Sequence, residues 1–275
     1  MTLTTGHGAV EPGPDQRWST WPSVAKGQRG PDPRPAWVVT AAAALDTELG
    51  VLKTGKEADV HLLERAVPDD PGQRVLLAAK RYRDPEHRQF HRDGTYTDGR
   101  RSRRSRDQRA AEDRRSAWGR GVRATQWADA EFSALATLWD AGAPVPYPVQ
   151  IDGTELLLEF VGTPDDDGTP VAAPRLAGCR PGPDLLADWF DQLRTAMGVL
   201  ARLGWAHGDL SPYNVLADGA RLVIIDLPQV VDLVANPAGA QLLHRDCRNL
   251  CAWFAARGLE VDADELFADV FAQAW

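Results

Sequence analysis

The stretch from His207 to Leu216, HGDLSPYNVL, and the run VIID that ends at Asp226 decide how the rest of the chain is interpreted. The loop has the spacing H-x-D-x-x-x-x-N, and an Asp-Gly turn after it predicts a hairpin that returns a second carboxylate. Phosphoryl transfer needs a carboxylate that takes the acceptor's proton and oxygen ligands that hold Mg²⁺ on the phosphates. Asp209 fits the first role, and Asn214 and Asp226 fit the second.

An Asp and an Asn five residues apart are also typical of an ordinary surface turn, because both residues favour turns. Here, however, the loop follows an amphipathic pattern at 186–203 that predicts a long helix ending at Gly204. It also precedes the predicted hairpin with its turn at 218–219. Order, spacing and context therefore agree on phosphotransfer chemistry.

Two charged residues upstream of this loop fit the same chemistry. The apolar run at 75–77 predicts a buried strand that ends at Lys80. A helix is predicted from about residue 125 to Gly142, and it carries Glu131. In kinases a strand lysine binds the phosphates and a helix glutamate orients it, so we expect this pair in an ATP site. Each residue taken alone is more typical of a solvated surface charge.

The segment GVLKTGKEADV at 50–60 contains most of a P-loop, G-x-x-x-x-G-K. The next residue is Glu57, where a P-loop requires a Ser or Thr hydroxyl to hold magnesium. On these residues alone the segment is a damaged P-loop, a chance match or the phosphate loop of another kind of enzyme.

On these residues the chain resembles the RIO family of atypical protein kinases, most closely the branch without an N-terminal winged helix. The resemblance runs from about Leu49 to the C-terminus. Its marks, in chain order, are TGKEADV, AAKRYR, WADAEFSAL, AGAPVPYPV, LLLEFVG, APRL, HGDLSPYNVL, IIDLPQVVD and HRDCRNL.

The resemblance implies roles on the phosphate side of an ATP site. Thr54 and Lys56 are expected to contact the ATP phosphates, together with nearby backbone N–H groups. Lys80 is expected to hold the α- and β-phosphates, and Glu131 to steady Lys80. Asp59 stands where the family often has Asn, which would place an additional negative charge near ATP.

The resemblance also implies roles on the adenine and acceptor sides. Backbone groups of the hinge from Glu159 to Val161 are expected to bind adenine. Asp209 is expected to be the catalytic base, with Asn214 and Asp226 as the metal ligands. Asp226 is also a candidate for receiving phosphate itself, as an aspartyl intermediate.

The order of the predicted elements indicates an α+β, bilobal, protein-kinase-like fold with a small β-rich N-lobe and a larger helical C-lobe. Residues 1–35 contain 5 Gly and 6 Pro, which predicts a flexible tail. We assign 36–161 to the N-lobe, with a basic insertion at about 84–123, and 162–275 to the C-lobe. The segment 163–184 resembles a linker or surface crossing, because it is rich in Pro, Gly and Asp.

The basic insertion supports two interpretations. Residues 80–123 contain 15 Lys or Arg against 7 Asp or Glu, although the whole chain has a net charge of -8. Clustered arginines release counterions from a phosphate backbone, which favours RNA or ribosome contact through 100–115. A solvated loop without a partner explains the same composition. Ser102 and Ser105 are candidate sites of self-phosphorylation.

The sequence therefore predicts a RIO-type phosphotransferase that uses ATP and Mg²⁺, or Mn²⁺ in its place, to phosphorylate Ser or Thr on a protein or on itself. ATP hydrolysis as a switch is a second output of the same site. Two alternatives stay open: a small-molecule kinase of the aminoglycoside or choline type, and an ATP-switched ribosome or RNA assembly factor.

Composition sets limits on location and redox chemistry. No apolar run approaches the length of a membrane span, and the N-terminus lacks the pattern of a signal peptide, so we expect a cytoplasmic protein without membrane contact. Cys179, Cys247 and Cys251 form neither a C-x-x-C motif nor a zinc pattern. We expect reduced thiols, with the last two on one helix face.

Overall fold

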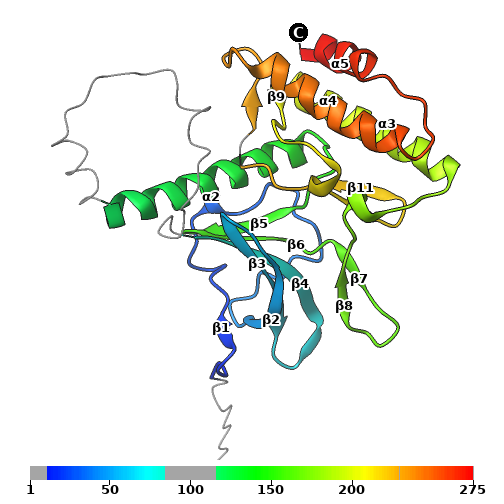
Figure 1. Cartoon of the computed structure of the whole chain (residues 1–275). Helices are drawn as coiled ribbons and strands as arrows, with labels where there is room; N and C mark the ends of the chain where they lie inside the picture. Colours follow the sequence, from blue (N-terminus) through cyan, green and yellow to red (C-terminus); the bar gives the residue numbers. More distant parts are fainter. Residues whose placement is uncertain (1–10, 84–115, 229, 275) are drawn as a thin grey trace, which may run out of the picture.

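The structure, a computed structural model, describes residues 11–83, 116–228 and 230–274. Figure 1 shows the strands of the first half gathered in one sheet and the helices of the second half gathered beyond it. Helix α2 (Ser116–Asp140) lies against the sheet. The predicted α+β arrangement, a strand-rich lobe followed by a helix-rich lobe, is confirmed.

Three predicted features fall outside the described residues. They are residues 1–10 of the expected tail, the arginine-rich segment at 100–115, and the acceptor candidates Ser102 and Ser105 within it. All three stay predictions from the sequence.

Six antiparallel strands form the sheet of the N-terminal lobe, in the spatial order β1-β2-β3-β4-β6-β5. Their bounds are β1 (Gln16–Trp18), β2 (Leu45–Thr54), β3 (Ala58–Val67), β4 (Asp70–Tyr82), β5 (Pro148–Asp152) and β6 (Glu155–Glu159). Strand β6 ends at Glu159, the first residue of the expected hinge.

The two faces of this sheet pack against different partners. Residues paired directly across strands share a face, so Leu63 and Leu77 lie on one face. Both are buried in a cluster that also contains Trp21, Val38, Ala79, Tyr147, Val149 and Leu157. Lys80 lies on the opposite face, in register with Val60 and Leu156. That second face meets α2 and the C-terminal lobe, since Leu156 belongs to the larger cluster shared with the helices.

The described part of the N-terminal segment differs from the predicted flexible tail at 1–35. Residues 16–18 form β1 and pair with β2, and the backbone N–H of Gly30 donates to Val149 O at 3.0 Å. Trp21 is buried against the first face of the sheet. The tail prediction is wrong for these residues, because burial of a large indole offsets the conformational entropy that the many Pro and Gly residues suggested.

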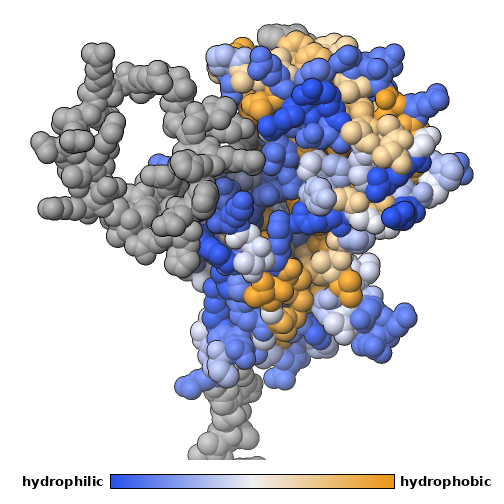
Figure 2. Space-filling model, in the orientation of Figure 1, coloured by the Kyte–Doolittle hydropathy of each residue, from blue (hydrophilic) through white to orange (hydrophobic). Residues whose placement is uncertain are grey.

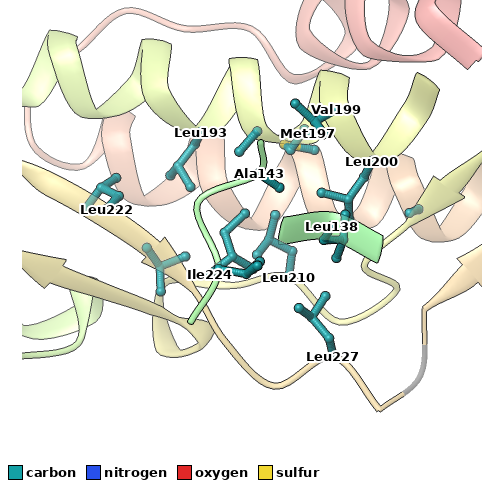
Figure 3. Packing of buried hydrophobic residues seen from close by; sticks show 14 of the residues in the cluster. Leu138, Ala143, Leu193, Met197, Val199, Leu200, Leu210, Leu222, Ile224 and Leu227 are labelled. Atoms are coloured by element: carbon teal, nitrogen blue, oxygen red, sulfur yellow. The ribbon is translucent and has the colours of Figure 1, made fainter. Parts of the chain in front are cut away.

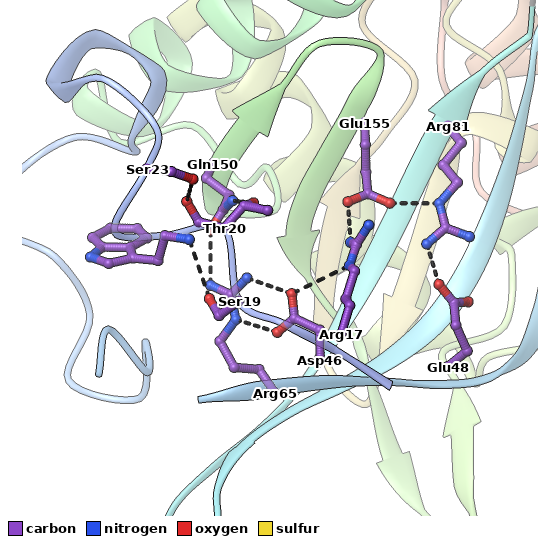
Figure 4. A network of polar contacts seen from close by, with 11 residues as sticks. Arg17, Ser19, Thr20, Ser23, Asp46, Glu48, Arg65, Arg81, Gln150 and Glu155 are labelled. Atoms are coloured by element: carbon purple, nitrogen blue, oxygen red, sulfur yellow. Dashed lines mark hydrogen bonds and ion pairs between the residues drawn. The ribbon is translucent and has the colours of Figure 1, made fainter. Parts of the chain in front are cut away.

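A buried polar network ties this segment to the sheet (Figure 4). The fully buried guanidinium of Arg65 donates through Nε to Asp46 Oδ1 at 2.7 Å and through Nη1 to Gln150 Oε1 at 2.9 Å. Gln150 in turn donates to the Thr20 hydroxyl at 2.7 Å. A buried charge without partners is costly, and here every partner is present. The strand-rich lobe therefore starts before the predicted boundary at residue 36.

The C-terminal lobe is built on three helices, and three two-stranded sheets accompany them. The helices are α3 (Pro183–Arg202), α4 (Gly239–Ala255) and α5 (Ala263–Phe271). The sheets pair β7 (Gly162–Pro164) with β8 (Pro170–Ala172), β9 (Trp205–Ala206) with β12 (Val231–Asp232), and β10 (Val215–Asp218) with β11 (Arg221–Ile224). Short 3-10 turns are η1 (Lys26–Gln28), η3 (Leu176–Gly178), η4 (Pro212–Asn214) and η5 (Ala272–Ala274).

Local sequence signals explain most of these boundaries. The predicted helix at 186–203 is confirmed, and Gly204 after it adopts a positive φ of 76°. Asp262 caps α5 by accepting hydrogen bonds from two backbone N–H groups. The Asp-Gly hairpin at 218–219 is confirmed as well. The segment 163–184 is more ordered than a linker, since it contains the β7–β8 hairpin and η3.

One continuous apolar core joins the two lobes. Figure 3 shows Leu193 and Leu200 of α3 packed near Ile224 of β11 and Leu138 of α2. Cys247 and Cys251 of α4 are buried in the same core, and all three cysteines are free thiols, as predicted.

The molecular surface is mixed in polarity. In the view of Figure 2, hydrophobic residues gather over the sheet and over part of the helical lobe, with hydrophilic residues between them. Among the helices that the structure describes, none is long and apolar enough to cross a membrane.

Candidate active site

Lys80 connects three separate parts of the chain. It stands near the end of β4, and its Nζ donates to Glu131 Oε1 of α2 at 2.6 Å and to Asp226 Oδ1 at 2.8 Å. The lysine is buried, with 9% of its surface exposed. Burial alone would lower the pKa of this ammonium, but Glu131 and Asp226 together raise it. Lys80 is therefore held as a cation between two carboxylates.

Glu131 is fixed by three donors. Besides Lys80, its carboxylate accepts from the Tyr82 hydroxyl and, at 3.2 Å, from the backbone N–H of Leu227. Burial and then the neighbouring Glu131 charge raise the pKa of Tyr82, so its hydroxyl stays a donor. The sequence did not single out Tyr82, although its position two residues after Lys80 puts both on one strand face.

Asp226 follows β11 with an unusual backbone. Its φ is +68°, in the left-handed region that non-glycine residues enter at a cost of about 1–3 kcal/mol. Hydrogen bonds on both sides hold this conformation, from Ile225 N to Asn214 O at 2.9 Å and from Leu227 N to Glu131. Burial opposes ionisation of the carboxyl, but Lys80 outweighs it and holds the pKa of Asp226 below its usual value.

The loop after β9 presents Asp209 to solvent. The side chain is 78% exposed, and its nearest charged partner is Arg245 Nη2 at 3.6 Å from Oδ1. Asn214 closes the loop, because its Nδ2 donates to the backbone carbonyl of Asp209 at 3.0 Å. The loop therefore leaves the Asp209 carboxylate accessible to an acceptor and brings Asn214 beside it.

His207 joins this loop to the strand that leads to Asp226. Its Nε2 lies 3.1 Å from the carbonyl of Ile225, and its Nδ1 accepts from the backbone N–H of Asp209 at 3.3 Å. This pattern requires a neutral ring with the proton on Nε2. Burial lowers the pKa of His207, which agrees with a neutral ring. His207 thus positions the loop and carries no charge.

Asp246 anchors the same loop from α4. Its buried carboxylate accepts from the backbone N–H groups of Gly208 at 2.8 Å and Leu210 at 2.9 Å. Asn249, one turn later, donates to the Leu210 carbonyl at 3.1 Å. Asp246 stands in the sequence motif HRDCRNL, but the sequence analysis gave this aspartate no role. Its only signal was an acidic residue on the apolar side of a predicted helix.

The phosphate loop lies between β2 and β3. Gly55 donates to the Ala58 carbonyl at 3.0 Å, and a Cβ at Gly55 would come within 2.8 Å of that oxygen. Any larger residue would therefore disturb the turn. Thr54 and Lys56 on either side are both exposed, so they are available to a ligand.

The charge of Asp59, expected to act near ATP, is already matched. Arg83 forms a two-pronged ion pair with its carboxylate, including Nε to Oδ2 at 2.6 Å. The hydrogen bond from Arg83 is the main reason that the pKa of Asp59 is lowered. The backbone N–H of Arg83 also donates to Glu57 O at 2.9 Å, so this residue ties the phosphate loop to the end of β4.

The predicted hinge connects β6 to the C-terminal lobe. The Glu159 N–H donates to Tyr147 O at 2.9 Å, and its carboxylate accepts from Tyr147 N at 3.0 Å. The Val161 carbonyl accepts from Ala173 N at 2.9 Å. An adenine ring that binds to Val161 would therefore accept a hydrogen bond from the backbone N–H of this residue.

The donor set fits magnesium. Among the residues that the structure describes, no group of three or more His, Cys, Asp or Glu side chains could hold a metal. Mg²⁺ suits such a sparse site, because it is bound by one or two protein oxygens together with phosphates and water. Asn214 uses its Nδ2 within the loop and keeps Oδ1, and Asp226 keeps the oxygen that Lys80 does not bind.

Comparisons with known proteins agree with this geometry. The family described as "RIO domain" matches residues 75–266. RIO-type serine/threonine-protein kinase Rio1 of Haloferax volcanii is 33% identical over 223 residues, which are 81% of this chain and 68% of that protein. Serine/threonine-protein kinase RIO1 of Chaetomium thermophilum is 29% identical over 223 residues, 78% of this chain but 40% of that protein.

Solved structures show the same fold. The Rio2 kinase of Chaetomium thermophilum, in a complex with ADP/Mg²⁺ and phosphoaspartate, matches with a TM-score of 0.53 and 20% identity over 82% of this chain and 62% of that one. A second structure of that kinase gives a TM-score of 0.54. The family match covers well over half of the chain and contains every residue described above from Lys80 to Asp246. The chain therefore belongs to the RIO family.

Proposed function

We propose that this protein transfers the γ-phosphate of ATP to a serine or threonine hydroxyl, on a partner protein or on its own chain, with Mg²⁺ as cofactor. The observation that carries the proposal is the Lys80 contact with both Glu131 and Asp226. It brings a strand cation, a helix carboxylate and a candidate metal ligand together beside the Asp209–Asn214 loop. The curated relatives named above are serine/threonine-protein kinases, which supports the same chemistry.

The residue roles follow from the contacts. Asp209, whose side chain is exposed and whose backbone binds Asn214 and His207, would accept the proton of the acceptor hydroxyl. Lys80, kept charged by its two carboxylates, would bind phosphate oxygens. Asn214 and Asp226 would hold Mg²⁺, which neutralises charge on the phosphates when bound. Thr54 and Lys56, on the exposed phosphate loop, would contact the phosphates from the sheet side.

A second output of the same site is transfer to Asp226 itself. The carboxylate would attack the γ-phosphorus, ADP would leave, and water would then hydrolyse the acyl phosphate to free phosphate. The 41% exposure of the Asp226 side chain supports this reaction. The phosphoaspartate in the Rio2 kinase complex also supports it. RNA contact through 100–115 and a cytoplasmic location stay proposals based on the sequence alone.

Transfer of γ-labelled phosphate tests the proposal. Wild type, Asp209→Ala and a control, Asp152→Ala, which changes an exposed aspartate at the end of β5, are incubated with labelled ATP and Mg²⁺. We expect label on the wild type and the control, and a loss of about 100-fold or more in Asp209→Ala. Label that survives acid and hydroxylamine marks Ser or Thr, whereas hydroxylamine-labile label marks Asp226. Equal labelling of wild type and Asp209→Ala, or no transfer and no hydrolysis by the wild type, would contradict the proposal.

A further inference from the structure

A bulge in β2 turns Lys53 toward the candidate active site. The register pairs Val51 with His61 but Lys53 with Val60, so Leu52 is an additional residue in β2. His61 and Val60 are consecutive and therefore point to opposite faces of the sheet. Val51 and Lys53 consequently point to opposite faces too, although residues two apart in a regular strand share a face. An earlier irregularity at Leu49, between the Glu48–Leu63 and Gly50–Leu62 pairs, shifts the register first, and the bulge at Leu52 returns Lys53 to the face opposite Leu63.

The bulge places Lys53 in one cross-strand row with Lys80. Lys53 pairs with Val60 on β3, and Val60 pairs with Lys80 on β4. Residues in such a row share a face, and two strand spacings of about 4.8 Å separate the two lysine backbones. Lys80 contacts Asp226 from this face, and Asp226 in turn acts electrostatically on Lys53. Lys53 therefore lies on the phosphate side of the proposed ATP site.

Arg175 approaches the same region from the other lobe. Its backbone pairs with Leu216 of β10, and its Nη1 donates to the Tyr213 carbonyl, next to Asn214. It is close enough to Lys53 for its charge to lower the pKa of that lysine. Neither Lys53 nor Arg175 forms a salt bridge within the part of the chain that the structure describes. Two cations that form no salt bridge among the described residues thus approach each other from opposite lobes, and Asp226 acts electrostatically on one of them, Lys53.

The electrostatics show that this arrangement has a cost in the free protein. Burial and then Arg175 hold the pKa of Lys53 below its usual value, Lys80 acts in the same direction, and the attraction of Asp226 does not compensate. A lowered pKa means that the folded chain holds the charged ammonium less favourably than water does. An anion between the two cations would offset the part of this penalty that comes from Arg175 and Lys80.

We propose that Lys53 and Arg175 form a second cationic clamp, one residue from each lobe, that closes on the phosphates of the bound nucleotide. The proposal rests on the proposed function, because it takes the ligand of the site to be ATP. It adds two phosphate-binding residues to Thr54, Lys56 and Lys80.

The test compares nucleotide affinity with stability. Lys53→Met and Arg175→Met keep side-chain length and remove charge, and Arg180→Met removes a charge from an exposed arginine five residues beyond Arg175. Titration calorimetry would measure the affinity of each full-length variant for ATP–Mg²⁺ and for adenosine. We expect each clamp variant to lose about 10-fold in ATP affinity, as for one charged hydrogen bond, with adenosine affinity unchanged. The Arg180→Met control should bind both ligands as the wild type does.

Two further measurements keep the outcome clear. The melting temperature of nucleotide-free Lys53→Met should equal or exceed that of the wild type, because the variant relieves repulsion. Lys53→Arg should recover most of the ATP affinity. Unchanged ATP affinity in both methionine variants, or an equal loss for adenosine, would overturn the clamp. A wild-type chain that binds no ATP would instead overturn the proposed function on which the clamp rests.

Discussion

The buried carboxylate of Asp246, in the middle of α4, accepts a hydrogen bond from the backbone N–H of Gly208 at 2.8 Å. A second bond, from Leu210 N at 2.9 Å, brackets Asp209 between the two anchored residues. The backbone around the proposed catalytic base is therefore shaped by a helix that begins 30 residues further along the chain. Positioning of Asp209 and stability of the C-terminal lobe should depend on the same carboxylate.

Replacing Asp246 by Ala should lower both stability and phosphate transfer. Two buried N–H groups would lose their acceptor, so we expect the free energy of unfolding to fall by about 2–4 kcal/mol. Urea denaturation of the full chain measures this loss. Asp269→Ala, which removes an exposed aspartate of α5, should change stability by less than about 0.5 kcal/mol. Equal stability of Asp246→Ala and wild type would show that the bonds to the loop contribute nothing.

Asp246 also predicts a pH dependence. Burial raises the pKa of its carboxyl to about 7, despite the two N–H donors and Arg245. A folded-state pKa above the unfolded value means that the native chain binds the proton more tightly, so this contribution to stability is lost as pH rises through about 7. The melting temperature of wild type relative to Asp246→Asn, which cannot titrate, should therefore fall between about pH 4 and about pH 7 and level off above that. Parallel curves for the two proteins would contradict the raised pKa.

Trp21 should contribute strongly to the stability of the N-terminal lobe. Its side chain is 5% exposed and packs with Leu77 and Tyr147, so Trp21→Ala should cost about 3–5 kcal/mol. Trp18, three residues earlier, is 45% exposed, and Trp18→Ala should cost much less. Chemical denaturation of both variants measures the contrast. If both cost the same small amount, the segment around Trp21 is not part of the folded lobe.

The Arg83–Asp59 pair should tune ATP binding at the phosphate loop. Arg83→Met leaves the Asp59 carboxylate without its main partner near the phosphates, so the KM for ATP should rise about 2- to 5-fold. Asp59→Asn in the same chain removes the unpaired charge and should restore most of the affinity. Steady-state kinetics at low and moderate salt would measure both variants, and the effect should shrink as salt increases. A double variant no better than Arg83→Met would exclude this charge effect.

The residues that the sequence could identify are those with local signals. Asp209 and Asn214 lie in one loop of fixed spacing, and Asp226 ends the hairpin that follows it. Lys80 and Glu131 stand on a strand and a helix with clear periodicity, and the structure joins them at 2.6 Å. The prediction of each of these residues depended on its spacing within one or two elements, and a single sequence contains that spacing.

The features that the sequence missed depend on contacts between distant elements. Asp246 acts on a loop 38 residues away, and its place on the apolar side of α4 does not reveal which backbone groups it binds. The composition of residues 1–35 indicated flexibility, because Pro and Gly outnumbered the few apolar residues. Burial of Trp21 against the sheet reversed that balance. The position of Lys53 was not predictable, because a bulge appears only when two strands are paired.

The bulge in β2 has a consequence for how this strand can change over evolution. The face on which Lys53 lies is set by the number of residues before it rather than by the identity of any of them. A one-residue deletion at Leu52 would keep every charged group of the chain yet move this cation to the far side of the sheet. An insertion or deletion of one residue at this point of β2 would thus decide which face of the sheet carries the Lys53 charge.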